Sequence, residues 1–125
     1  MDTPTKRILI VDDEAGFTRL MKLTLEGTKK YTVKEENDGS KAIYTARQFR
    51  PDLILLDIVM PKMDGGDVAR QITNDQMLKD VKIIFLTAIV SQKEGVGTIG
   101  GFPFMAKPVS LAALRAMIDE TLGVA

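Results

Sequence analysis

Residues 52–65 read Asp52-Leu53-Ile54-Leu55-Leu56-Asp57-Ile58-Val59-Met60-Pro61-Lys62-Met63-Asp64-Gly65, and they decide the fold. Four consecutive apolar residues, followed by a carboxylate and by a turn with proline and glycine, indicate a strand that is buried on both faces. The carboxyl end of this strand carries Asp57. An isolated aspartate at a strand end is most often a hydrogen-bonded turn residue, so the meaning of Asp57 depends on the other strands.

Further apolar stretches, each short enough for one strand, also run into polar residues. They are residues 8–11 before Asp12-Asp13-Glu14, residues 83–86 before Thr87, and residues 102–105 before Ala106-Lys107-Pro108. Apolar residues at helical spacing lie between these stretches, and alternating strands and helices predict a parallel sheet with helices on both faces. Ligands of such sheets bind beyond the carboxyl ends of the strands. The residues predicted at those ends are Asp12, Asp13, Asp57, Thr87 and Lys107.

The composition of the 125 residues limits the classes of function. The 17 Lys and Arg residues balance 17 Asp and Glu residues, so there is no basic field for nucleic acid or for an anionic membrane surface. The chain has no Cys and no His, so a bound metal would be hard and oxygen-ligated. Its lack of cysteine favours a cytoplasmic location. The first apolar run is too short for a signal peptide or a membrane span, and the length predicts one domain, 1–125.

At these motifs the sequence resembles the receiver domain of two-component response regulators, over essentially its whole length. The resemblance is carried by four motifs in this order: Ile8-Leu9-Ile10-Val11-Asp12-Asp13-Glu14, Leu55-Leu56-Asp57-Ile58-Val59-Met60-Pro61 with Asp64-Gly65, Thr87-Ala88, and Lys107-Pro108. Single-domain chemotaxis regulators are the members that it looks most like. The resemblance implies a flavodoxin-like doubly wound (βα)5 fold, with a five-stranded parallel sheet in the order 2-1-3-4-5.

Such a fold would bring three carboxylates together. At an effective dielectric constant of about 20, two carboxylates about 4 Å apart repel each other by about 4 kcal/mol, so a cation is needed among them. With oxygen ligands only, Mg²⁺ is the natural occupant. The resemblance implies that Mg²⁺ contacts a carboxylate of the pair Asp12 and Asp13, the carboxylate of Asp57 and the backbone carbonyl of Val59.

The resemblance also implies the chemistry of signalling. Asp57 would be the nucleophile that takes a phosphoryl group from a phosphohistidine of a partner histidine kinase or phosphotransfer protein. Lys107 and Thr87 would contact that group; Thr87 would then move toward it, and Phe104 would swing into the space that Thr87 leaves. The two states would bind a downstream protein differently. The protein would catalyse only its own phosphorylation and its slow dephosphorylation, without being an enzyme in the usual sense.

Three alternatives compete with this interpretation. A phosphatase of the haloacid dehalogenase type would also use a strand-end aspartate and Mg²⁺, but it needs a second acid where Val59 stands. A flavodoxin-like flavin-binding module would need a phosphate-binding loop where Asp12-Asp13-Glu14 would repel phosphate. A receiver that is no longer phosphorylated would act only by docking, and the intact set of site residues disfavours it. The chain is either a stand-alone receiver or the receiver part of a longer regulator.

Two departures from the family pattern carry expectations of their own. Ser91-Gln92-Lys93-Glu94 is a capping box that would start a fourth helix, but glycines crowd residues 95–101. We therefore expect a short or frayed helix held by Val96 and Ile99 and ordered by phosphorylation, or alternatively a rigid glycine-rich packing. The side chains two residues after Asp57 and Thr87, which are Val59 and Ile89, cannot hydrogen-bond water. They predict a long-lived acyl phosphate.

Overall fold

The computed structural model describes residues 5–88 and 96–124. Among these residues, no helix has the length and the apolar character needed to cross a membrane. The strands are β1 (Lys6–Val11), β2 (Tyr31–Glu36), β3 (Leu53–Asp57), β4 (Lys82–Thr87), β5 (Val96–Ile99) and β6 (Phe102–Ala106). The helices are α1 (Ala15–Glu26), α2 (Ala42–Phe49), α3 (Gly65–Asn74) and α4 (Leu111–Leu122), with a 3₁₀ turn at Gly39–Lys41.

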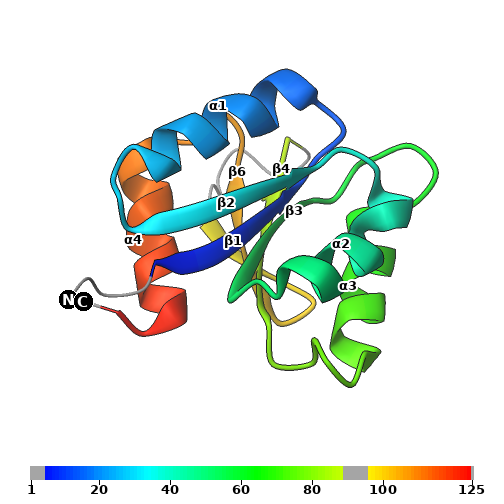
Figure 1. The fold of residues 1–125 in the computed structure, drawn as a ribbon. Coiled ribbons are helices and arrows are strands. Elements are labelled where there is room, and N and C mark those ends of the chain that lie inside the picture. The colour runs from blue at the N-terminus through cyan, green and yellow to red at the C-terminus, as the bar shows by residue number, and fades with distance from the viewer. Residues whose placement is uncertain (1–4, 89–95, 125) are drawn as a thin grey trace.

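The sheet has the order β2-β1-β3-β4-β6-β5, and its first five strands are parallel. Helices α1 and α4 cover one face, and α2 and α3 cover the other (Figure 1). Along β1 and β3, successive side chains point to opposite faces, so Leu9 and Ile54 pack with α2 and α3 while Ile8 and Leu55 pack with α1 and α4. All four of these side chains are fully buried, as expected for central strands of a parallel sheet.

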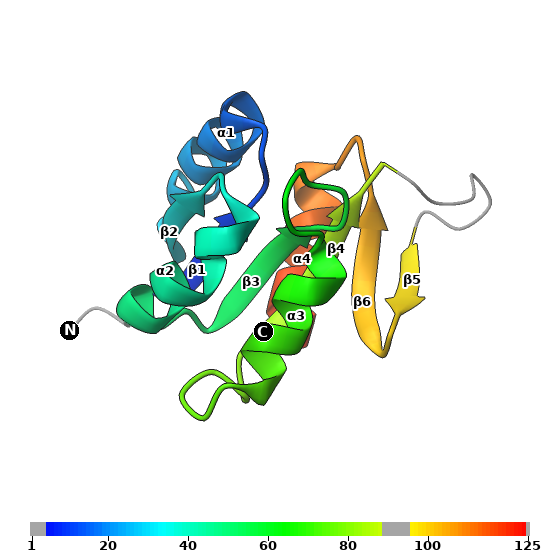
Figure 2. The same ribbon diagram turned by 90° about the vertical axis from the view of Figure 1, so that its right-hand side faces the viewer.

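The flavodoxin-like fold and the order of its parallel strands are confirmed, with β6 as the fifth parallel strand. The strand count is corrected from five to six. The extra strand is β5, which lies at the edge of the sheet and pairs antiparallel with β6 (Figure 2). In the described part of the chain there are therefore four α-helices, and the (βα)5 expectation of a helix before the last parallel strand is not met across residues 96–101.

The hairpin between β5 and β6 explains this correction. Gly100 and Gly101 have φ angles of 58° and 88°, and they form the two-residue turn between the paired residues Ile99 and Phe102. Glycine adopts positive φ at both turn positions without steric cost. A two-residue turn of this geometry joins two antiparallel strands in a β-hairpin. Two of the glycines that we expected to fray a helix held by Val96 and Ile99, Gly100 and Gly101, therefore build a turn, and Gly97 lies in β5. The capping box Ser91–Glu94 lies outside the described residues.

Candidate functional site

The carboxyl ends of β1 and β3 bring the predicted acids together. Val11 of β1 pairs with Leu56 of β3 in the parallel ladder. Asp12 and Asp57 are the next residues after this pair, so they lie side by side. Carboxylate oxygens of Asp12, Asp13 and Asp57 all lie within 4.8 Å of one another. Asp12 is 1% and Asp57 is 6% exposed, whereas Asp13 is exposed. Two buried carboxylates this close need a cationic neighbour.

Lys107 is that neighbour in the protein itself. Its Nζ lies 2.6 Å from Asp12 Oδ2, 3.7 Å from Asp57 Oδ2 and 3.6 Å from Glu14 Oε1. The loop after β6 holds it in place because the Lys107 backbone N–H donates to the Thr87 carbonyl at 2.9 Å. The peptide bond between Lys107 and Pro108 is cis.

Burial and neighbouring charges shift the pKa values of Asp57 and Lys107. Burial, and then the charge of Asp12, raise the pKa of Asp57 to about 6, although Lys107 partly offsets the shift. Burial alone would lower the pKa of Lys107, but the hydrogen bond and the charges of the surrounding acids raise it. At neutral pH the site therefore holds an ammonium among carboxylates, and Asp57 is ionised at an electrostatic cost.

The donor set fits a hard divalent cation. Three carboxylates converge here and offer the oxygen ligands that Mg²⁺ requires. Proteins bind Mg²⁺ through a small number of carboxylates, so coordination positions remain for water and phosphate oxygens. The Val59 backbone N–H donates to Asp57 Oδ1 at 3.3 Å, so the main chain at position 59 is held beside the acid. The Val59 side chain is half exposed and turns away from the core.

The other two predicted residues lie at different depths. Thr87 is fully buried at the end of β4, next to the strand that ends in Asp57. Phe104 is 4% exposed on β6, where it is opposite Phe85 and packs in the core on the α2 and α3 side. It is not part of the acid pocket. Phe102 is partly buried and meets the Phe85 ring edge to face at a centroid distance of 5.8 Å.

In the sequence, Gly65 stood out only as part of the turn after Asp57 and of the family motif, but its absent side chain shapes the site. A Cβ atom at position 65 would lie 2.8 Å from Ile58 Cα and would also overlap the Asp57 carbonyl oxygen. The Gly65 N–H donates to the Ile58 carbonyl at 2.7 Å, which closes the loop beneath Asp57. Asp64 caps α3 by accepting a hydrogen bond from the Asp67 N–H, as its position predicts.

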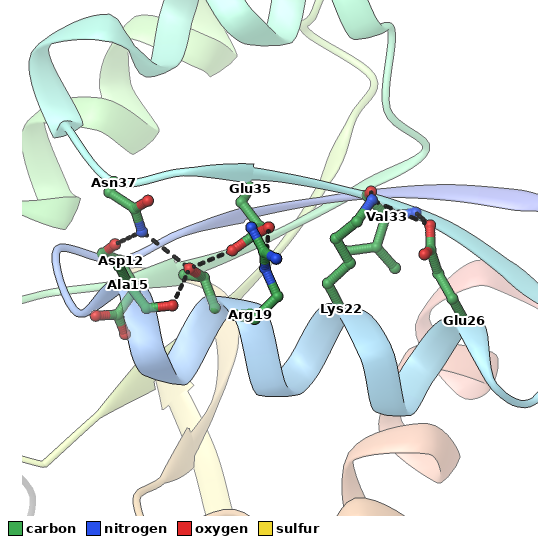
Figure 3. A network of polar contacts seen from close by, with 9 residues as sticks. Asp12, Ala15, Arg19, Lys22, Glu26, Val33, Glu35 and Asn37 are labelled. Atoms are coloured by element: carbon green, nitrogen blue, oxygen red, sulfur yellow. Dashed lines mark hydrogen bonds and ion pairs between the residues drawn. The ribbon is translucent and has the colours of Figure 1, made fainter.

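A polar network beside Asp12 was also missed (Figure 3). The Asn37 side-chain amide donates to the Asp12 carbonyl at 2.8 Å and to the Thr18 hydroxyl at 2.9 Å. The Thr18 hydroxyl in turn donates to Glu35 Oε1 at 2.9 Å. These residues come from β2, from α1 and from the loop after β2, so no periodicity links them. The network fixes the backbone that presents the acid pair.

Comparisons with known proteins agree with this geometry. The sequence profile of the response regulator receiver domain matches residues 8–119. The DNA-binding response regulator MtrA of Mycobacterium tuberculosis is 40% identical over 124 residues, which cover 98% of this chain and 53% of MtrA. The chain spans about half the length of the curated relatives it matches.

Solved structures give the same result. Chemotaxis protein CheY4 of Vibrio cholerae superposes with a TM-score of 0.82 at 26% identity, covering 94% of this chain and 99% of CheY4. The receiver domain of sensor histidine kinase PA1611 from Pseudomonas aeruginosa superposes with a TM-score of 0.81 at 27% identity, covering 96% of this chain and 99% of that one. That structure has a magnesium ion coordinated in the active site cleft. The chain therefore belongs to the response regulator receiver domain family of two-component systems, whose members are phosphorylation-dependent signalling switches.

Proposed function

We propose that this receiver domain accepts a phosphoryl group on Asp57 from a histidine kinase or a phosphotransfer protein, with Mg²⁺, and so controls the binding of a downstream protein. The observation that carries the proposal is the pocket itself: a buried Asp57 with two further acids within 4.8 Å and the Lys107 ammonium at 3.7 Å. The 125 residues contain no histidine, so the phosphohistidine lies outside this receiver domain. We place this exchange in the cytoplasm, as the sequence predicts.

The proposed reaction is a transfer between two nucleophiles. A carboxylate oxygen of Asp57 forms a bond to phosphorus while the bond from phosphorus to the donor nitrogen breaks, and the electron pair stays on the imidazole. The carboxylates of Asp12, Asp13 and Asp57 and the backbone carbonyl of Val59 would hold Mg²⁺. The bound ion would supply positive charge to the phosphoryl oxygens. The Lys107 ammonium neutralises the charge that the new acyl phosphate brings into the pocket.

The proposed switch starts from a packed state. Thr87 is buried at the end of β4, one residue beyond the pair formed by Asp57 and Leu86. A hydrogen bond from its hydroxyl to a phosphoryl oxygen would displace the loop that follows β4. Phe104 lies on the next strand, opposite Phe85, so it is close enough to repack when that loop moves. The changed surface would then be the one that the downstream protein distinguishes.

The test of this function is covalent labelling. Wild-type protein incubated with a small acyl phosphate and Mg²⁺ should gain the mass of one phosphoryl group, and chelator should prevent the gain. Asp57→Asn should gain none, whereas the control Asp64→Asn, which keeps a side-chain oxygen for the helix cap, should be labelled like the wild type. Equal labelling of Asp57→Asn would overturn the assignment. No labelling of the wild type, by this donor or by a kinase, would favour the docking-only alternative.

We also expect the acyl phosphate to be long-lived, because Val59, two residues after Asp57, carries a half-exposed apolar side chain that offers no hydrogen bond to water. Its predicted companion, Ile89, lies outside the described residues. In Val59→Asn a side-chain hydrogen bond of about 1 kcal/mol could orient the attacking water, which corresponds to about fivefold faster hydrolysis. Loss of the phosphoryl mass over time measures this rate. Val59→Leu is the apolar control, and equal rates in both variants would contradict the role of position 59.

A further inference from the structure

The ring of Phe17 faces the cation of the site. The Lys107 Nζ lies 4.4 Å from the centroid of this ring, within the range of an attractive contact between a cation and an aromatic face. Phe17 is the third residue of α1, and side chains in a helix lean toward its amino end. The ring therefore reaches back over the loop that carries Asp12. No motif in the sequence includes Phe17.

The surroundings of the Lys107 ammonium divide into two kinds. Asp12 Oδ2 lies 2.6 Å away and accepts a hydrogen bond from it, whereas carboxylate oxygens of Asp57 and Glu14 lie 3.7 and 3.6 Å away and attract its charge. The Phe17 ring attracts the positive charge but offers no lone pair. The Lys107 side chain is only 14% exposed, so few water molecules compete with either kind of contact.

The present position of the ammonium is set by Asp12, whereas the proposed phosphoryl group arrives on Asp57. The ammonium is 1.1 Å closer to Asp12 than to Asp57 (3.7 − 2.6). To meet a phosphoryl oxygen it must shift from the first acid toward the second. A directional hydrogen bond would resist this shift, but attraction to a ring face depends weakly on small lateral displacements.

We infer that Phe17 is a positioning residue for Lys107, whose ring keeps the ammonium in the pocket while it moves from Asp12 to the phosphoryl group on Asp57. The inference rests on the proposed function. Phe17 does not touch the reacting atoms; it acts through the lysine. Its ring also shields one side of the ammonium from water, which strengthens the remaining electrostatic contacts.

A packing role is the alternative, since Phe17 is partly buried against the cluster beneath α1 and α4. Packing depends on the volume of the ring, whereas the inferred role depends on its electrostatic face. Phenylalanines carrying one, two or three ring fluorines weaken the negative face stepwise with little change of volume. Phe49 provides a matched control, because the Arg7 guanidinium lies 4.1 Å from its ring centroid near the opposite end of β1.

The experiment places the fluorinated residues at position 17 or at position 49 of the full chain and measures the rate of Asp57 phosphorylation by a small acyl phosphate. We expect a stepwise decrease at position 17, reaching about threefold to tenfold with three fluorines, and no trend at position 49. Phe17→Leu should be slowed to a similar extent and Phe17→Tyr, which keeps the ring, should not. The Mg²⁺-induced rise in melting temperature should be unchanged in each variant, which shows that the acids are intact.

A rate that is flat across the position 17 series, with wild-type labelling intact, would overturn the role of the ring and leave the proposed function standing. If Phe17→Leu is phosphorylated slowly but the rate is the same across the fluorinated series, the rate depends on the volume of the side chain. That result would also overturn the role of the ring and would favour packing. Failure of the wild type to be labelled on Asp57 would instead overturn the proposed function and the inference together.

Discussion

Replacing Asp57 with asparagine should stabilise the metal-free protein, although it removes the proposed phosphoacceptor. The pKa of Asp57 rises from 3.8 to about 6 in the folded protein, so its ionised form is less favourable there than in the unfolded chain. A difference of about two pKa units corresponds to about 3 kcal/mol. Above pH about 6 the wild type bears this full cost, and the neutral amide of Asp57→Asn removes it. We expect the free energy of unfolding to rise by up to about 3 kcal/mol at neutral pH.

The pH dependence of stability gives the sign of this effect. Between pH about 4 and 6 the folded wild type binds a proton at Asp57 that the unfolded chain has released, so its stability increases as the pH falls through this window. Asp57→Asn should lack this component. Urea unfolding in chelator at several pH values measures it, with Asp80→Asn, an exposed acid before β4, as the control. An asparagine variant that is no more stable than the wild type at neutral pH would contradict the buried charge.

Addition of Mg²⁺ should produce the second large change in stability. A ligand that binds only the folded state adds about 2.7 kcal/mol at a hundred times its dissociation constant, so the melting temperature in Mg²⁺ should exceed that in chelator. Asp13→Asn should melt higher than the wild type in chelator, because one of three converging carboxylates is removed. The same variant should respond less to Mg²⁺, since it has lost a ligand. The two effects have opposite signs.

Thermal unfolding of both proteins over a Mg²⁺ titration tests this pair of effects. Asp80→Asn again serves as the control, because it changes the net charge equally at a site outside the pocket. Identical melting of the wild type in chelator and in Mg²⁺ would mean that the three carboxylates do not act as one site. A variant with an undiminished response would remove Asp13 from the proposed ligands and leave Asp12 and Asp57.

The parallel sheet and the polar residues at its strand ends were predictable because their signals are local and repeated. Uninterrupted apolar runs such as residues 53–56 mark buried strands, and each run ends in the polar residue that the sheet then brings to one edge. The strand order that makes β1 and β3 neighbours came from the resemblance to receiver domains; with that order Asp12 lies beside Asp57, and the structure has them there. Lys107 followed from the same rule.

We predicted a short helix where the structure has the β5 hairpin, because two local signals conflicted. The capping box at residues 91–94 favoured a helix, and the glycines were interpreted as breaks in that helix. Gly100-Gly101 between Ile99 and Phe102 also matches the two-residue hairpin turn, which was the better interpretation. Contacts such as Phe17 with Lys107 and Asn37 with Asp12 had no local signal at all. Their partners are far apart in the chain and meet only in the folded protein.

The close approach at Gly65 has a consequence for genetics. A functional screen of random variants would mark this position together with Asp57, because any added side chain must displace the main chain that presents the acid. The screen could not tell a residue that reacts from one that leaves space. An inherited change at Gly65 would thus imitate loss of the phosphoacceptor while every proposed reacting group was still encoded.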